Sequence, residues 1–205
     1  PLQNTWIFEY DAADRLSKVS DPLSGVSAYG YDLNDNLSSQ TDARGFITAF
    51  EYDKLNRRST VIYPAQTVVG QSEPVSAQAL AAYDANGNLT SETDANGRVI
   101  THAYDVLDRK ASSTYQVRAG EDDLQGMAYS YDANNNLTQI SETYSGATGV
   151  RITQREYDRF DRMTADVDAR NERIGYNYDA NGNRTRLIDP DGQVTRYVYD
   201  ALNRL

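Results

Sequence analysis

The dipeptide Tyr-Asp recurs nine times along this chain of 205 residues, at nearly regular intervals. The pairs begin at Tyr10, Tyr31, Tyr52, Tyr83, Tyr104, Tyr131, Tyr157, Tyr178 and Tyr199. Five of the eight intervals are 21 residues, and the others are 31, 27 and 26. A fixed period is typical of repeat proteins, whose units bury their apolar faces against their neighbours. We therefore expect residues 1–205 to form a single array, with loop insertions at about 60–80, 115–127 and 143–150.

Each Tyr-Asp pair leads into a predicted tight turn. The first turn residues are Asp11, Asp32, Asp53, Asp84, Asp105, Asp132, Asp158, Asp179 and Asp200. Three positions later, every unit has Asp, Asn or Gly, which are the residue types that tolerate a positive φ. A type I turn followed by one left-handed residue makes a three-residue hairpin loop with a β-bulge. The aspartate can also accept hydrogen bonds from the N–H groups of its own turn.

A second predicted turn follows about ten residues after the first. It spans Asp42–Gly45, Asp94–Gly97, Asp168–Asn171 and Asp189–Gly192, and "DPLSG" at 21–25 is interpreted as the same turn with one extra residue. The glycines assigned to turns are Gly45, Gly87, Gly97, Gly182 and Gly192. Two turns in each unit imply two strands, so we expect an all-β strip of about eighteen antiparallel strands, which twists and curls. The segment "VSAQALAAY" (75–83) is interpreted as a short helix.

A stripe of aromatic residues is predicted on one face of this strip. Six of the nine residues that lie two before a Tyr-Asp tyrosine are aromatic, and residues two apart share a strand face. Tyrosine dominates, with 16 Tyr against 4 Phe and 1 Trp. We expect the rings to be buried as a thin interior, with each hydroxyl bonded to a polar partner. The alternative is an exposed ladder of rings that stacks against sugars.

The composition disfavours several kinds of partner. There are 20 Lys and Arg against 30 Asp and Glu, so the net charge is −10, whereas binding to nucleic acid or an anionic membrane needs a positive field. The absence of cysteine excludes disulfides and thiolate metal sites. No apolar run approaches the ~20 residues of a membrane-spanning helix. The first residues, "PLQNTWIFEYD", lack the pattern of a signal peptide.

Motifs that suggest chemistry are explained better by the repeat. The segments that begin at Asp32, Asp84 and Asp132 resemble the start of a calcium loop, but the twelfth position of the loop that begins at Asp84 is Ala95 instead of the required glutamate. The only histidine, His102, occupies a stripe position, and there is no G-x-S-x-G or H-E-x-x-H motif. Four glycosylation-like sequences, at 36–38, 88–90, 136–138 and 183–185, fall at one repeat position. We therefore expect no enzyme activity and no catalytic, metal or cofactor site.

The segments "YDANGNLTSETDANG" (83–97) and "DPDGQVTRYVYDALNRL" (189–205) show the pattern most clearly. This pattern resembles the YD-repeat, or Rhs-repeat, family, which includes bacterial Rhs polymorphic toxins, the B and C components of Tc toxins, and teneurins. The resemblance implies a strip that spirals into a hollow shell, which in bacterial members encloses a toxic C-terminal segment. The family's self-cleaving region carries a stretch near "DPxGL". The chain has "DPDGQ" at 189–193 instead, which fits an ordinary repeat turn.

Two functional hypotheses follow from these observations. The first is a non-enzymatic shell segment of a longer, secreted or surface-displayed protein, whose partners are the rest of that shell and its enclosed toxin. The alternative is a cell-surface module that binds carbohydrate or protein. Because unpaired strand edges can template association, we also expect self-association through the end strands.

Overall fold

The computed structural model describes residues 5–67, 74–116, 124–146 and 149–205. The described residues form 17 β-strands and no helix, which confirms the predicted all-β class with one strand fewer than expected. Two compact units, residues 1–101 and 102–205, make up the chain, and the division falls within β9. The single array over 1–205 stays a prediction. Parts of the three predicted insertions, 68–73, 117–123 and 147–148, lie outside the described residues.

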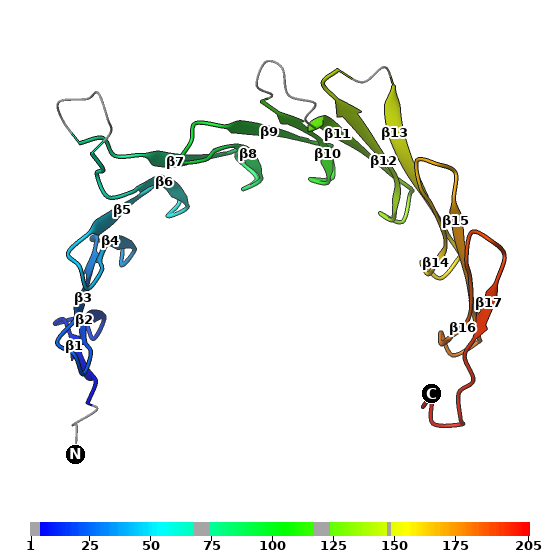
Figure 1. The fold of residues 1–205 in the computed structure, drawn as a ribbon, viewed down its shortest axis with the longest axis horizontal. Helices are drawn as coiled ribbons and strands as arrows, with labels where there is room; N and C mark the ends of the chain where they lie inside the picture. The colour runs from blue at the N-terminus through cyan, green and yellow to red at the C-terminus, as the bar shows by residue number, and fades with distance from the viewer. Residues whose placement is uncertain (1–4, 68–73, 117–123, 147–148) are drawn as a thin grey trace. The chain divides into compact units, whose positions relative to one another are not determined.

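The first unit is an antiparallel meander in which each strand pairs with the next along the chain (Figure 1). Its strands are β1 (Ile7–Tyr10), β2 (Leu16–Ser20), β3 (Val26–Tyr31), β4 (Leu37–Thr41), β5 (Ile47–Tyr52), β6 (Arg58–Ile62), β7 (Gln78–Tyr83), β8 (Leu89–Thr93) and β9 (Val99–Tyr104). Tyr-Asp turns join β1 to β2, β3 to β4, β5 to β6 and β7 to β8. In a meander these turns share one edge, and the other connections lie at the opposite edge.

The second unit continues the same pattern. Its strands after β9 are β10 (Lys110–Tyr115), β11 (Leu124–Tyr131), β12 (Leu137–Tyr144), β13 (Val150–Tyr157), β14 (Met163–Val167), β15 (Arg173–Tyr178), β16 (Arg184–Ile188) and β17 (Val194–Arg196). From β10 to β17, each strand pairs antiparallel with the next. Strands β11, β12 and β13 are the longest of this unit, with eight residues each.

The Tyr-Asp turns have the predicted geometry. All nine residues at the predicted left-handed position have positive φ, from 58° at Asp14 to 95° at Gly87. In the first turn, the N–H of Asp14 donates to the carbonyl of Asp11 at 3.1 Å, and the N–H of Asp11 donates to the carbonyl of Arg15 at 2.8 Å. The strand register shifts beside the tyrosine, between Glu9 and Tyr10 in this hairpin. This shift is the bulge that the turn type requires.

The interpretation of "DPLSG" as a turn with one extra residue is wrong. The N–H of Ser24 donates to the carbonyl of Asp21 at 3.1 Å, and the N–H of Asp21 donates to the carbonyl of Gly25 at 2.9 Å. The turn therefore has the usual length, and Ser24 takes the left-handed position with φ 66°. In this geometry a Cβ on Gly25 would come too close to the carboxylate of Asp21, so that side chain would have to shift.

The interpretation of residues 75–83 as a helix is also wrong. Residues Gln78–Tyr83 form strand β7, in which Leu80 lies opposite Thr60 on one side and Thr93 on the other. The alanines of this segment favour a helix by intrinsic propensity. The neighbouring strands β6 and β8 offer backbone partners on both sides, and this tertiary context outweighs the propensity.

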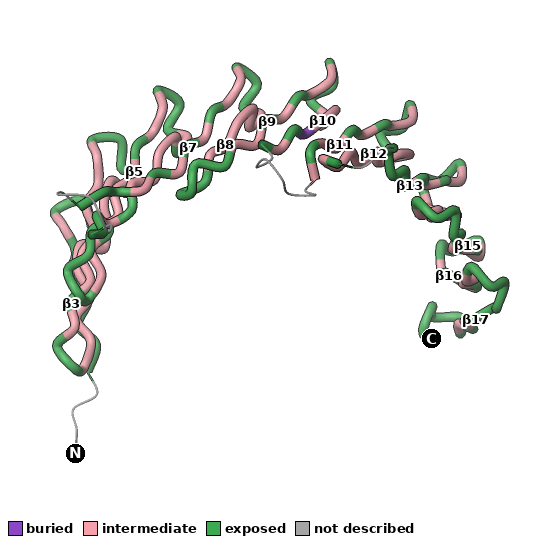
Figure 2. The backbone as a smooth tube through the Cα atoms, turned by 45° about the horizontal axis from the view of Figure 1, so that its top comes forward, coloured by how far each residue is buried: buried purple, intermediate pink, exposed green. Residues whose placement is uncertain are grey.

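The expected thin interior is only half covered. Among the described residues, only Ala165 and Ser113 are fully buried, and nearly all other positions are half-buried or exposed (Figure 2). Every Tyr-Asp tyrosine from Tyr31 onward is half-buried, whereas Tyr10 on the edge strand β1 is 60% exposed. The aromatic stripe is likewise half-buried, except for Phe8 on β1. The rings are therefore covered mainly by neighbouring hairpins.

Candidate functional site

In seven Tyr-Asp pairs of the described chain, the tyrosine links its hairpin to the preceding hairpin. The hydroxyl of Tyr31 donates to the carbonyl of Leu16 at 2.9 Å, and the hydroxyl of Tyr178 donates to the carbonyl of Met163 at 2.8 Å. The equivalent bonds run from Tyr52 to Leu37, Tyr83 to Arg58, Tyr131 to Lys110, Tyr157 to Leu137 and Tyr199 to Arg184. In each case the acceptor lies six residues after the preceding tyrosine. This repeated acceptor explains why the position needs tyrosine and not phenylalanine.

These hydroxyl bonds lie where the backbone ladder between hairpins has ended. The ladder between β14 and β15 stops at the pair Ala165 and Gly175, and Tyr178 bonds to Met163 beyond it. Backbone groups that lose their ladder partner need another one. The hairpins are thus joined by main chain at one edge and by side chains at the edge that carries the Tyr-Asp turns.

The aspartate of each pair organises its own turn. In the turn after Tyr157, Oδ1 of Asp158 accepts the N–H of Phe160 at 2.8 Å and of Arg162 at 3.1 Å, while Oδ2 accepts Nε of Arg162 at 2.8 Å. The same set of three bonds surrounds Asp11, Asp32, Asp53, Asp84, Asp105, Asp132, Asp179 and Asp200. Each carboxylate fixes the turn by hydrogen bonds to its anionic form.

These hydrogen bonds lower the pKa of all nine aspartates below the ordinary value of 3.8. In eight of the turns, the largest cause of the lowered pKa is the side-chain hydrogen bond from the Arg or Asn four positions later. At Asp200 the backbone N–H of Arg204 has the largest effect on the pKa. Hydrogen bonds to a charged form favour that form.

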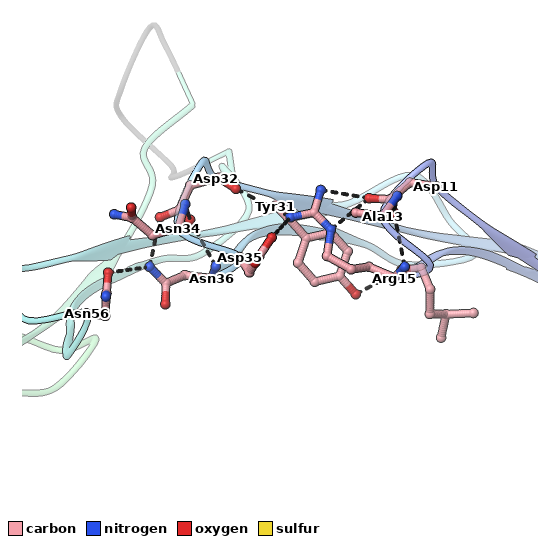
Figure 3. Close-up of polar contacts among 10 residues, drawn as sticks. Asp11, Ala13, Arg15, Tyr31, Asp32, Asn34, Asp35, Asn36 and Asn56 are labelled. Atoms are coloured by element: carbon pink, nitrogen blue, oxygen red, sulfur yellow. Dashed lines mark hydrogen bonds and ion pairs between the residues drawn. The ribbon is translucent and has the colours of Figure 1, made fainter.

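The residue four positions after the aspartate also reaches the next hairpin, as Figure 3 shows for two consecutive turns. Arg15 pairs with Asp11, its own turn aspartate, at 2.7 Å, and its Nη1 contacts Asp35 in the next turn. Asn36 donates to its own Asp32 at 3.0 Å and to Asn56 of the following turn at 2.9 Å. Sequence analysis did not single out these residues, although their position after each aspartate is visible in the sequence.

A hollow of about 510 Å³ lies in the first unit, where the aromatic stripe is interrupted. Its lining includes Ala81, the stripe residue of its repeat, and the rings of Tyr63 and Tyr83. Val61 and Glu92 are also part of the lining. The small alanine at a position that is aromatic in most repeats leaves this space open.

The groups considered for chemistry are engaged in structure. Nδ1 of His102 lies 2.9 Å from Oγ of Ser113, which is 2% exposed and so is not presented to a substrate. The described residues contain no group of three or more His, Asp or Glu side chains that could hold a metal ion. The amide nitrogen of Asn36, in one of the glycosylation-like sequences, donates to two acceptors. In the described part of the chain, no helix is long and apolar enough to cross a membrane.

Gly87 gives a test of the turn geometry. Its φ of +95° lies in the left-handed region, and the only atom near an added Cβ would be Nη1 of Arg57 at 3.9 Å, so space is available. Gly87→Val should therefore lose ~1 kcal/mol or more of stability through backbone strain alone. The matched control is Gly87→Asn, because Asn56 and Asn135 occupy the same position in other turns. Equal denaturation midpoints for the valine variant and the wild type would contradict the assignment of Gly87 to the left-handed position of the turn.

Several solved structures are similar to this chain. A crystal structure of TcdB2-TccC3-Cdc42 has 15% identity and a TM-score of 0.49, and the match covers 97% of this chain and 13% of that one. A crystal structure of TcdB2-TccC3 without its hypervariable C-terminal region has 15% identity and a TM-score of 0.45, with coverage of 89% and 12%. The Photorhabdus luminescens Tc holotoxin pore has 13% identity and a TM-score of 0.34, with coverage of 95% and 17%. This chain thus spans a small part of the length of these proteins.

Comparison with curated proteins gives no match. The family model described as RHS Repeat matches residues 31–68, 83–120 and 178–205, which together make up just over half of the chain. The matched segments contain six of the nine Tyr-Asp turns, which begin at Tyr31, Tyr52, Tyr83, Tyr104, Tyr178 and Tyr199. The chain is therefore a structural repeat segment that belongs to the RHS repeat family.

Proposed function

We propose that this chain is a non-enzymatic wall segment of an Rhs-type shell, which encloses a C-terminal toxin and helps to deliver it. Membership of the repeat family supports this proposal. The observation that carries it is that the repeated polar side chains make structural contacts. The Tyr-Asp hydroxyls and carboxylates hold turns and neighbouring hairpins together, as at Tyr178 and Asp158. A wall of this kind needs side chains that join repeats, and no chemistry of its own.

The proposal implies a set of partners and a location. The partners are the remaining repeats of the parent shell and the toxin inside it, and the parent protein's export system takes the segment out of the cell. The edge strand β1 bears exposed Ile7, Phe8 and Tyr10, which preceding repeats of the parent shell would cover. Self-association through this edge stays a prediction for the isolated chain.

Protease protection in the full-length parent protein tests this function. We expect the segment that follows the repeat array to resist trypsin while the shell is intact. The same segment expressed without the array should be cut rapidly, which controls for its intrinsic sensitivity. Equal cleavage of the segment with and without the array would overturn the enclosing role.

The second candidate is a module that binds carbohydrate. The hollow beside Tyr63 and Tyr83 favours it, because rings next to the carboxylate of Glu92 combine a stacking surface with a hydrogen-bond acceptor. Glycan-array binding by the isolated chain, abolished by Ala81→Tyr in the hollow or by Tyr176→Ala in the stripe, would favour this candidate. If neither the isolated chain nor its variants bound any glycan, the shell segment would remain the better-supported function.

A further inference from the structure

The residue four positions after each Tyr-Asp aspartate alternates strictly between arginine and asparagine. In chain order these residues are Arg15, Asn36, Arg57, Asn88, Arg109, Asn136, Arg162, Asn183 and Arg204. Two kinds of contact between hairpins therefore alternate within each unit. We call the contacts made by Arg15, Arg57, Arg109 and Arg162 arginine joints, and the contacts made by Asn36, Asn136 and Asn183 amide joints.

An arginine joint combines an ion pair, hydrogen bonds and a ring contact. Nη2 of Arg109 pairs with Asp105 at 2.7 Å, while Nη1 donates to the carbonyl of Asp132 at 3.3 Å and to Oδ1 of Asn135 at 2.8 Å. The guanidinium lies 4.6 Å from the ring centroid of Tyr131, the tyrosine of the next hairpin. The ion pair, the carbonyl bond and the ring contact recur at Arg15, Arg57 and Arg162.

The next hairpin also covers the guanidinium of an arginine joint. The side chains of Arg15, Arg57, Arg109 and Arg162 are 23–27% exposed, whereas that of Arg204, which has no described hairpin after it, is 73% exposed. Charged hydrogen bonds are shorter and stronger than neutral ones, and a cation over a ring adds attraction when solvent is excluded. Opening an arginine joint therefore exposes a group that the joint has desolvated and paired.

An amide joint has fewer contacts, and its donor is an uncharged amide, although the acceptor for Asn136 is the carboxylate of Asp161. Nδ2 of Asn36 donates to Asn56 of the next turn at 2.9 Å. Asn136 and Asn183 make the same contact with Asp161 and Asn203, and Asn134 and Asn181 each donate to the same acceptor. In the described part of the chain, the tyrosines that follow amide joints, Tyr52, Tyr157 and Tyr199, have no guanidinium over their rings. Their hydroxyl bond to the preceding hairpin is the same in both kinds of joint.

We propose that the cooperative unit of this array is a pair of hairpins held by an arginine joint, and that the strip opens and flexes first at the amide joints. Examples of such pairs are β5–β8 around Arg57 and β13–β16 around Arg162. The stability of a repeat array is the sum of unit and interface contributions, so interfaces of two strengths divide it into blocks. The block here is two Tyr-Asp repeats long, not one.

Hydrogen exchange of the full chain, resolved by mass spectrometry, tests this inference with two reciprocal variants. Asn36→Arg and Arg109→Asn are matched because the receiving residue is asparagine in both joints, Asn56 and Asn135. We expect Asn36→Arg to slow exchange of the ladder amides between β4 and β5 about tenfold, and Arg109→Asn to speed exchange between β10 and β11 about tenfold. The ladders compared have three residue pairs each.

Asn36→Lys controls for the added charge, because an ammonium lacks the planar fork that bonds two acceptors at once. It should slow exchange between β4 and β5 by less than about threefold. The proposal is overturned if Asn36→Arg leaves that exchange unchanged, or if lysine and arginine have equal effects. Asn36→Arg replaces the two bonds of the Asn36 amide by the larger set of contacts found in an arginine joint, so it tests the proposal even if Arg109→Asn destabilises the whole array.

Discussion

Tyr178→Ala is expected to lower the free energy of unfolding of its part of the array by about 3 kcal/mol, whereas Tyr178→Phe should lower it by only about 1 kcal/mol. The alanine variant loses a half-buried ring, which lies 4.7 Å from the guanidinium of Arg162, together with the hydroxyl bond to Met163 at 2.8 Å. The phenylalanine variant keeps the ring and loses only the bond. Urea denaturation, followed by the fluorescence of the tyrosines, measures both losses.

The effect of Tyr178→Ala should also be local. Hydrogen exchange should increase most in the ladder between β14 and β15, which ends next to the lost bond, and least in β1–β4. Tyr10→Phe is a useful comparison, because Tyr10 is 60% exposed and no described hairpin precedes it. If Tyr10→Phe and Tyr178→Phe destabilised the chain equally, the hydroxyl bonds between hairpins would not be what makes tyrosine necessary.

Acid should destabilise the array as a whole. The pKa of each Tyr-Asp aspartate is lowered in the folded chain, first of all by side-chain hydrogen bonds in most turns, so the folded state binds protons less readily than the unfolded chain. The stabilisation from such a group is fully present above its unfolded pKa, near 3.8, and is lost as the pH falls through the lower folded pKa. We expect a constant thermal midpoint from about pH 8 to 5, and a steep fall below about pH 4.

Salt separates the causes of this acid transition. Because hydrogen bonds lower the pKa of these aspartates more than the Coulombic attraction does, the transition should persist in ~1 M NaCl, which screens exposed charges. Asp158→Asn, which cannot ionise, should make the stability less dependent on pH in the same range. A thermal midpoint at pH 2 equal to that at pH 7 would show that the carboxylates contribute little to the turns.

Sequence patterns predicted the turns well because the constraint on them is local. The order Asp-x-x-Asp/Asn/Gly identified the left-handed residue in all nine Tyr-Asp turns, since few residue types tolerate that conformation. The helix interpretation of 75–83 failed because strand pairing with β6 and β8 decides this segment, and pairing depends on distant residues. Ser24 was missed because serine is uncommon at a left-handed position.

The contacts between hairpins could be foreseen only in part. The sequence indicated that the tyrosine hydroxyls need partners, but it did not indicate that the carbonyl of Met163 or Leu16 supplies one. Those carbonyls become available only because the ladder stops short of the turns. The alternation of Arg57 with Asn36 is present in the sequence, and its meaning follows once the reach of each side chain to the next hairpin is known.

The two edges of the strip differ in how freely their loops can change in length. Every Tyr-Asp turn keeps one length, because a side chain such as Arg57 must reach across to its neighbour, whereas the connection from β6 to β7 at the opposite edge occupies residues 63–77. Main-chain pairing holds that opposite edge whatever loop follows it. Evolution can therefore diversify one margin of such a protein with new loops, and so with new recognition surfaces, while the seam along the other margin keeps its dimensions.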